Sequence, residues 1–354
     1  MLEREAAGTS RVLGGPIVEI LQPENERLDR PDSPLQAMSY IDLQKLKVPP
    51  RQYLLEPWLS KRGLAMVYAP RGIGKTLFAL AVAYAVASGA SFLGFTAPAP
   101  SRVLYIDGEM SLLHMQERVA AITGGEEKVD PSFLGLLSSD ALDGRMPDLG
   151  TIEGQQQLAP LVEKYDLIII DNVSTLVRTG GENDGDSWRV VQEWELKQRR
   201  AGRAVLLVHH TNKKGTQRGT SKHEDVLDTV LSLSRPDGYG ASDGAHFTLT
   251  FEKTRGFYGA DAEPLEAHYS VENGRRHWTF GPIADERTER AAVLFDKGLT
   301  VRKVADELGI SKTAAGLLRQ EWEKQRAKTE RVPVSRAPGS EKTGQAAEAS
   351  GLNA

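Results

Sequence analysis

Four runs of aliphatic residues recur along the middle of the chain, and segments with helical spacing separate them. The runs are LAMVYA from Leu64, RVLYIDGE from Arg102, DLIIIDN from Asp166 and AVLLVHHT from Ala204. They are apolar at nearly every position, so both faces of each strand must be buried. Strands of this kind lie in parallel sheets with helices on both faces. The pattern therefore predicts an α/β fold built on a mainly parallel sheet.

Two strand pairs with turn signals follow these runs. TVLSLSR and HFTLTFEKTRG flank the turn-rich segment RPDGYGASDG, which predicts a hairpin that extends the sheet. HYSVENGRRHWTF contains Asn273-Gly274, a strong hairpin turn signal. We expect the α/β domain to end between Phe280 and Ile283.

Helical spacing returns from Asp285 in three pieces. Gly298 and Gly309 can end the first two, and Thr300 and Ser311 can cap the second and the third. Two helices of this size joined by a short turn predict a helix-turn-helix, in which the third helix would read DNA. Small three-helix units also serve as protein docking modules, so this alternative stays open.

Composition and periodicity divide the chain into four parts. A loosely ordered arm of mixed charge and proline precedes the α/β domain, and a polar tail rich in Gly, Ala and Ser follows the helices. The expected boundaries are 1–38 for the arm, 39–283 for the α/β domain, 284–327 for a small all-α helix-turn-helix domain and 328–354 for a disordered tail.

Composition also excludes several classes of protein. The 354 residues include 44 Lys and Arg against 48 Asp and Glu, so no overall basic field attracts nucleic acid and any DNA contact must be local. The absence of cysteine excludes disulfides, thiolate zinc sites and thiol chemistry. The N-terminus lacks the layout of a secretory signal, and the apolar run from Leu77 is shorter than the roughly 20 residues of a membrane span. We expect a cytoplasmic protein that does not contact a membrane.

The stretch GLAMVYAPRGIGKTLFALAVAYAVASG runs from a strand through a glycine loop into an alanine-rich helix. This is the context of a P-loop, in which backbone N–H groups and a helix N-terminus surround phosphates. Lys75 can reach the β- and γ-phosphates of ATP, and the Thr76 hydroxyl can hold Mg²⁺. The residues expected to bind the nucleotide are Ala69, Pro70, Arg71, Gly72, Ile73, Gly74, Lys75 and Thr76.

The loop departs from the usual P-loop pattern at Ala69, which replaces the first glycine. A Cβ atom at the strand end is compatible with the loop if the backbone φ of Ala69 stays negative. Gly72 and Gly74 are the positions that need a positive φ and a close approach to phosphate. Arg71 is interpreted as a solvated loop arginine.

Three carboxylates stand at strand ends of the same alternating chain. Asp171 ends DLIIID, and its carboxylate would reach Mg²⁺ through water or through Thr76. Glu109 and Asp107 stand at the sheet edge where open α/β folds bind ligands, and either could be the general base that polarises an attacking water. An acidic residue favoured by the dipole of the following helix is the alternative, and the residues alone do not decide.

Taken in order, APRGIGKT, YIDGEM, IIIDN, LLVHHT and FEKTRG resemble the motifs of RecA/DnaB-like P-loop ATPases, most closely the RepA-type hexameric replicative helicases of plasmids and mobile elements. The resemblance covers about residues 40–283. It implies a RecA-like P-loop NTPase core and a homo-oligomer in the form of a hexameric ring. It further implies ATP hydrolysis at subunit interfaces and movement along single-stranded DNA.

The resemblance also implies roles for single residues. Glu109 matches the family's catalytic glutamate, and His209 matches the sensor that links the γ-phosphate to the DNA-facing loop. His210 is interpreted as a strand-end histidine with a backbone partner. Lys253 and Arg255, two residues apart and on one face of a strand, match cationic fingers that enter the neighbouring subunit's site. Without the resemblance, they would be interpreted as a solvated strand end.

Two sets of basic residues are candidates for DNA contact. Lys213, Lys214, Arg218 and Lys222 stand among small residues after LLVHHT, which suits contact with the phosphates of single-stranded DNA. An ordinary solvated loop is the alternative. The loop after Asp171 is acidic and a poor phosphate contact. In the C-terminal helices, duplex DNA at an origin would be contacted by Lys312 and Arg319.

These patterns favour an ATP-dependent DNA helicase or single-stranded DNA translocase of a plasmid or mobile element. The alternative is an ATP-switched DNA-binding recombination mediator or regulator without unwinding activity. A small-molecule kinase is disfavoured, because Glu109, His209 and the Lys253/Arg255 pair suit water activation and sensing of a neighbour rather than a closing substrate lid.

Overall fold

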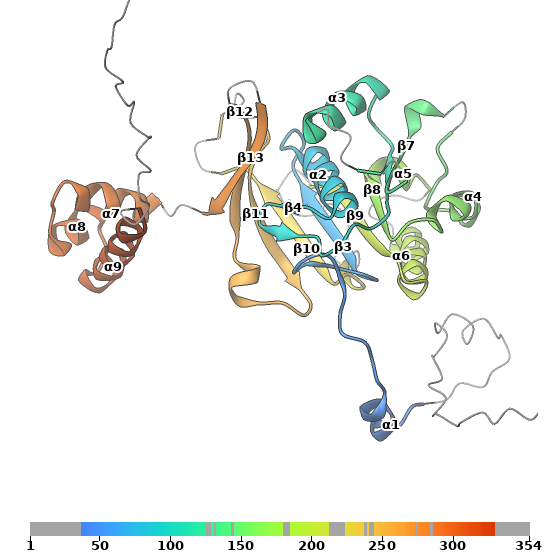
Figure 1. Ribbon diagram of the computed structural model, residues 1–354, viewed down its shortest axis with the longest axis horizontal. Helices are drawn as coiled ribbons and strands as arrows, with labels where there is room; N and C mark the ends of the chain where they lie inside the picture. Colours follow the sequence, from blue (N-terminus) through green and yellow to red (C-terminus); the bar gives the residue numbers. More distant parts are fainter. Residues whose placement is uncertain are drawn as a thin grey trace, which may run out of the picture. The chain divides into compact units, whose positions relative to one another are not determined.

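The computed structural model divides into a larger compact unit that ends at Pro282 and a smaller one that begins at Ile283 (Figure 1). The structure describes residues 37–124, 129–130, 132–142, 145–179, 185–211, 224–236, 239–240, 244–272, 275–283 and 286–329.

The larger unit is built on a nine-stranded sheet with the order β13-β12-β11-β10-β3-β9-β8-β6-β7. The strands from β10 to β7 in this order pair in parallel, and β11, β12 and β13 are antiparallel to their neighbours. The predicted α/β fold with a mainly parallel sheet is confirmed. The strands are β3 (Leu64–Ala69), β6 (Val103–Asp107), β7 (Leu134–Ser138), β8 (Leu167–Asp171), β9 (Ala204–His210), β10 (Thr229–Ser234), β11 (His246–Thr254), β12 (Leu265–Glu272) and β13 (Arg275–Pro282).

Helices cover both faces of this sheet (Figure 1). Helix α2 (Lys75–Ser88) packs on one face beside α3 (Leu112–Thr123), and its Phe78 and Val82 lie in a core with alternate residues of the central strands. The opposite face is covered by α4 (Ile152–Val162), α5 (Val173–Leu176) and α6 (Gly185–Arg200), whose Trp188 and Trp194 lie in a second core. Because α2 is buried on nearly all sides, the apolar run from Leu77 is a core helix.

Both predicted hairpins of the larger unit are present. Strand β10 pairs with β3 in parallel and with β11 in antiparallel orientation, and β12 pairs with β13 along eight residue pairs. The hairpins therefore extend the sheet beyond the P-loop strand.

Several short or edge elements carry no clear pattern in the sequence. Strand β7 lies at the sheet edge, half exposed, and contains Gly135, whose absent Cβ leaves room for the Tyr165 ring. Helix α4 is polar in its middle and contains Pro160. The small elements are α1 (Tyr40–Lys45), β1 (Tyr53–Leu55), β2 (Leu59–Ser60), β4 (Ser91–Phe92), β5 (Phe95–Thr96) and the 3₁₀ turns Ser139–Ala141 and Gly259–Ala262.

Among its described residues, the smaller unit contains three helices, α7 (Glu286–Asp296), α8 (Val301–Leu308) and α9 (Lys312–Thr329), around Ala291, Phe295 and Val304. The predicted caps are confirmed. The Thr300 side chain accepts a hydrogen bond from the Lys303 N–H, and Gly309 ends α8 in the left-handed conformation. No helix in the described ranges is long and apolar enough to cross a membrane.

Candidate nucleotide-binding site

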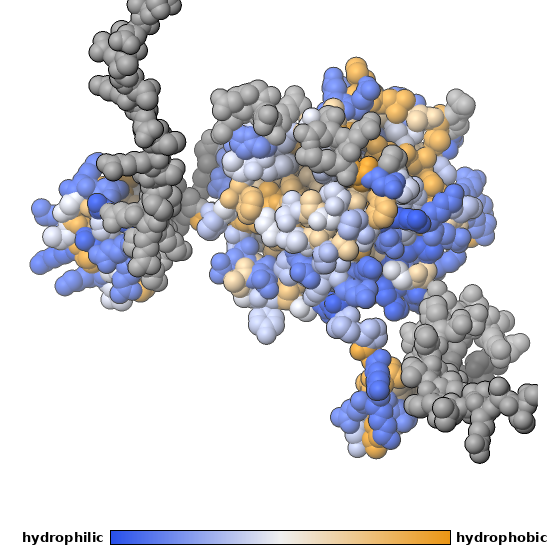
Figure 2. Space-filling view, viewed as in Figure 1, coloured by the Kyte–Doolittle hydropathy of each residue, from blue (hydrophilic) through white to orange (hydrophobic). Residues whose placement is uncertain are grey.

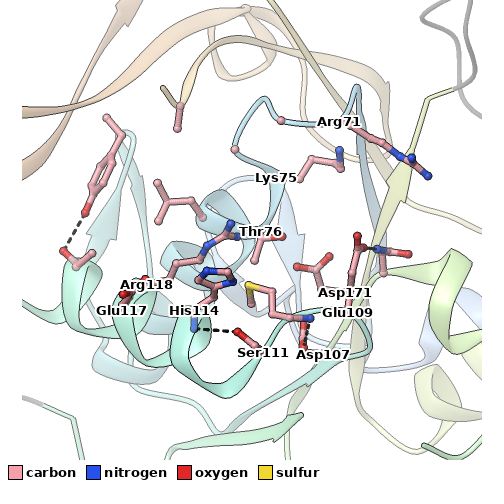
Figure 3. Close-up of a pocket in the computed structure, with 18 of the residues that line it drawn as sticks. Arg71, Lys75, Thr76, Asp107, Glu109, Ser111, His114, Glu117, Arg118 and Asp171 are labelled. Carbon is pink, nitrogen blue, oxygen red and sulfur yellow. Dashed lines mark hydrogen bonds between the residues drawn. The ribbon is translucent and has the colours of Figure 1, made fainter. Parts of the chain in front are cut away.

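A cavity of about 1410 Å³ lies where β3, β6, β8 and β9 end, next to the N-termini of α2 and α3 (Figure 3). Open parallel sheets bind ligands at this edge, because the loops after successive strands diverge there. Of the residues named from the sequence, those that line the cavity are Arg71, Gly72, Gly74, Lys75, Thr76, Asp107, Glu109, Asp171 and His210.

The P-loop has the backbone geometry that its glycines predict. Gly72 and Gly74 have φ of 77° and 106°, in the left-handed region. A Cβ atom at Gly74 would lie 2.6 Å from the Ala245 Cβ, so this glycine is also required by packing. Among the described non-glycine residues, only Arg62 and Leu93 have a positive φ, so Ala69 meets the condition set for its substitution. Ile73 is fully buried and anchors the loop in the core.

Lys75 is held inside the loop by two backbone carbonyls. Its Nζ donates to the oxygens of Ala69 at 2.9 Å and Pro70 at 2.6 Å, and the residue is 6% exposed. Burial lowers the pKa of Lys75 to about 8, while the negative charges of Asp171 and Glu109 oppose this shift. Lys75 lines the cavity, and a phosphate bound there would stabilise the charge of its ammonium group.

Asp171 lies beside Thr76 at the floor of the cavity. The Tyr105 hydroxyl donates to its Oδ2 at 2.5 Å, and the residue is 3% exposed. Burial raises the pKa of Asp171, against hydrogen bonds from Tyr105 and Thr76. A hydroxyl and a carboxylate are oxygen ligands that suit Mg²⁺. No group of three His, Cys, Asp or Glu side chains with metal-ligand spacing occurs in the described ranges, so water and phosphate oxygens would complete the coordination.

Glu109 and Asp107 differ in what they can reach. The Glu109 side chain is 61% exposed and lines the cavity, and its Oε2 accepts a hydrogen bond of 2.5 Å from the Asn172 side chain. Asp107 is 1% exposed, accepts a hydrogen bond from the Met110 N–H, and has a pKa raised to about 6 by burial. The geometry favours Glu109 as the group that reaches a water in the cavity. Asn172 was missed from the sequence, although it directly follows Asp171.

The two histidines at the end of β9 are arranged in the reverse of the expected way. His209 was expected at the nucleotide site, but His210 lies there. His209 is fully buried, and its place in β9 directs it to the sheet face opposite the P-loop helix. His210 lines the cavity, with its Nε2 3.9 Å from Glu109 Oε2. Burial and the charge of Lys75 lower the pKa of His210 to about 4, so its ring is neutral and this contact is not an ion pair. We therefore correct the sensor assignment from His209 to His210, where it stays a prediction.

Lys253 and Arg255 lie far from this cavity. Thr254 pairs with Thr229, which pairs with Ala65 near the start of β3, whereas the P-loop follows the end of β3. Strand β3 has 6 residues, so the sheet edge at its start and the edge at its end, where the P-loop lies, are roughly 20 Å apart. Both cations contact the segment before β10: Lys253 donates to the Glu224 carbonyl, and Arg255 donates to the Asp225 carbonyl. They cannot act on the P-loop of their own chain.

The described residues include only some of the candidate DNA contacts. Lys213, Lys214, Arg218 and Lys222 lie outside the described residues. In the smaller unit, Lys312 is exposed at the start of α9. Arg319 pairs with Glu323 at 2.8 Å, and its guanidinium lies over the rings of Phe295 and Trp322. Arg319 is therefore engaged within its own unit.

The cavity also extends along α3, which the sequence did not indicate. His114, Glu117 and Arg118 of this helix line it (Figure 3). Tyr269 of β12 also lines it, and its hydroxyl donates to the Ala121 carbonyl of α3 at 3.0 Å. The helical spacing of α3 is visible in the sequence, but only the sheet topology brings β12 beside it.

The parallel sheet, the P-loop and the acidic strand ends together define a P-loop ATPase with a RecA-like core. The sequence matches a family model described as an AAA domain over residues 29–216, which is more than half of the chain, and the chain belongs to this family. A search of curated proteins found no significant match. Among solved structures, a KaiC-like protein, PH0186 from Pyrococcus horikoshii OT3, matches with 12% identity and a TM-score of 0.43, over 64% of this chain and 93% of that one. At this level the similarity does not extend to function.

Proposed function

We propose that this chain is an ATP-dependent DNA helicase or single-stranded DNA translocase of a plasmid or mobile element, which works as a hexameric ring. One observation carries the proposal. Lys253 and Arg255 lie at the sheet edge opposite the P-loop of their own chain. If they are the cations that complete catalysis, each site needs residues from two chains, and hydrolysis takes place at subunit interfaces.

The cavity residues have distinct roles in this proposal. Lys75 and the P-loop N–H groups bind the phosphates, and Thr76 and Asp171 hold Mg²⁺, which would neutralise phosphate charge. Glu109 accepts a proton from the attacking water, and the Asn172 amide orients its carboxylate. Arg255 of a neighbouring chain stabilises the charge that develops on the phosphates in the transition state.

Strand β9 supports a link from this cavity to DNA. The Ala69 carbonyl accepts hydrogen bonds from both Lys75 Nζ and the Thr211 N–H. A bound phosphate that draws Lys75 away leaves the Ala69 oxygen with one hydrogen bond fewer. The same oxygen holds Thr211 at the end of β9, so phosphate binding would be felt there. The basic residues from Lys213 to Lys222 follow directly in the sequence, so the proposal makes them the DNA-contacting segment.

Strand displacement tests the proposal. The full chain, with ATP and Mg²⁺, is expected to displace a strand from a forked duplex, whereas Lys75→Ala does not. A mixture of Arg255→Ala and Lys75→Ala proteins is expected to hydrolyse ATP faster than either alone, because mixed interfaces contain one intact P-loop and one intact Arg255. A fully active Arg255→Ala protein contradicts the interface part of the proposal.

The second candidate function is an ATP-switched DNA-binding mediator or regulator that does not unwind DNA. The separate three-helix unit favours it, because such units bind duplex DNA or proteins independently of an ATPase. ATP hydrolysis stimulated by DNA, without strand displacement on any fork, supports this candidate over the first.

A further inference from the structure

A second pocket, of about 330 Å³, lies at the sheet edge opposite the P-loop. Its cationic side chains come from four separate segments: the residues before β1, the turn after β2, the end of α6 and the residue after β11. Five cations line it against the single carboxylate of Asp228, and they are Arg51, Lys61, Arg62, Arg199 and Arg255. Figure 2 shows hydrophilic surface where the segment that leads from α1 enters the larger unit.

The positive charge of this pocket is mostly uncompensated. Asp228 pairs with Arg199 and lies 3.9 Å from Arg255, and its Oδ2 also accepts the Leu64 N–H. Arg51 and Arg62 have no carboxylate partner among the described residues. Burial and the charge of Arg255 lower the pKa of the nearby Lys253, while the negative charges of Glu224, Asp225 and Asp228 oppose this shift.

Neutral backbone carbonyls orient the guanidinium groups. Arg51 Nη1 donates to the Arg255 oxygen at 2.8 Å, and Arg62 Nε donates to the Arg199 oxygen at 3.2 Å. Gly256, with φ of 96°, leaves the space that the Arg51 guanidinium fills, since a Cβ there would lie 1.9 Å from Arg51 Nη1. Because a guanidinium has five N–H donors, most donors of Arg51 and Arg62 remain available for an anion.

Two further features indicate a built site rather than a random group of surface cations. Arg62 has φ of 63°, a left-handed conformation that is unfavourable for a side chain with a Cβ atom and that persists where the surroundings impose it. Trp58 is 3% exposed and lines the pocket, and its Nε1–H has no hydrogen-bond partner in the described part of the chain.

We propose that this pocket is a phosphate receptor, in which Arg51, Lys61 and Arg62 act beside Arg255 on the terminal phosphates of a nucleotide held by a second copy of the chain. The inference rests on the proposed function, which places Arg255 at the neighbour's site. Arginine forks bind phosphate through paired N–H groups, and a concave site of this size suits the compact terminal phosphates of a nucleotide rather than an extended nucleic acid backbone.

The first test measures binding of inorganic pyrophosphate to the full chain with Lys75→Ala, which weakens the P-loop. The melting temperature is expected to rise with pyrophosphate more than with sodium chloride of equal ionic strength. Adding Arg51→Gln and Arg62→Gly is expected to abolish this rise. Gln keeps a donor for the Arg255 carbonyl, and Gly relieves the positive φ, so neither change should unfold the chain. A rise equal to that with salt, or one that persists in the variant, overturns the proposal.

The second test identifies the source of the phosphate. The Arg51→Gln/Arg62→Gly protein with an intact Lys75 is expected to show a kcat for ATP lower by about tenfold. Mixing it with Lys75→Ala protein is expected to restore part of the rate, because the latter supplies an intact pocket. The control is Arg189→Ala, whose side chain is 75% exposed on α6 and pairs with Glu193, and which should keep the wild-type rate.

A wild-type rate in the double variant, or a mixture no faster than the sum of its parts, shows that the pocket does not serve a second copy's nucleotide. The proposed function fails separately, if the wild-type chain does not hydrolyse ATP. In that case the pyrophosphate measurement still tests the pocket.

Discussion

Glu195 is a buried acid in the core of the larger unit and has no role in the proposed catalysis. It is fully buried on α6, the helix that also carries Trp188 and Trp194 in the second core. Neither of its carboxyl oxygens has a hydrogen-bond partner in the described part of the chain. Burial raises the pKa of Glu195 to about 8, against the opposing charge of Arg199. The folded chain therefore holds this carboxyl protonated at neutral pH.

The raised pKa couples stability to pH with a definite sign. Unfolding exposes the carboxyl, whose pKa then returns to its ordinary value of 4.5. Between these two values the folded state binds a proton that the unfolded state releases, so stability is full below pH 4.5 and falls as the pH rises towards 8. The slope is about 1.4 kcal/mol per pH unit. From about pH 5 to about pH 7.5, the contribution of Glu195 thus changes by about 3 kcal/mol.

The matched variant is Glu195→Gln, which has a similar shape and stays neutral at every pH. Urea unfolding of both proteins, followed by the fluorescence of the buried Trp188 and Trp194, gives the difference in free energy of unfolding at each pH. We expect the variant to gain stability relative to wild type by about 3 kcal/mol between about pH 5 and about pH 7.5. Other titrating groups cancel in this difference. A difference that does not change with pH would show that Glu195 is not protonated in the folded chain at neutral pH.

The remaining predictions concern the nucleotide cavity. Glu109→Gln should keep ATP binding but lower the single-turnover hydrolysis rate at least about a hundredfold, and equal rates would exclude Glu109 as the base. His210→Ala should reduce the stimulation of hydrolysis by DNA, with little change in melting temperature. His209→Ala should instead lower the melting temperature, because it leaves a cavity. Loss of DNA stimulation in His209→Ala but not in His210→Ala would restore the sensor role to His209. Gly74→Ala should abolish nucleotide binding in a fluorescence titration, because its φ of 106° and the nearby Ala245 exclude a Cβ atom; retained affinity would contradict the described loop geometry.

The sequence predicted the P-loop well because its signals are local. Gly72 and Gly74 mark the backbone conformation, and the flanking strand and buried helix supply the context. The strand ends at Asp107 and Asp171 were equally clear, since each follows a fully apolar run. These features depend on neighbouring residues, which a sequence displays directly.

The uniformly apolar sequence of β9 made this strand easy to find, but it also hid which of its two histidines faces the nucleotide cavity. AVLLV is apolar at every position because both faces of β9 are buried, so no alternation indicates which face His209 or His210 occupies. Only pairing with β3 and β8 determines it. The cationic pocket is less accessible still, because Arg51, Arg62 and Arg255 are far apart in the sequence and the strand order brings them together.

The cavity at Lys75 is expected to hydrolyse ATP. The measurement is the steady-state release of phosphate from ATP by the wild-type chain and by Lys75→Ala, with Mg²⁺ and with or without single-stranded DNA. We expect hydrolysis by the wild-type chain, a faster rate with DNA, and no release above background by Lys75→Ala under either condition. Equal rates for the two proteins, or no hydrolysis by the wild-type chain under either condition, would contradict this expectation.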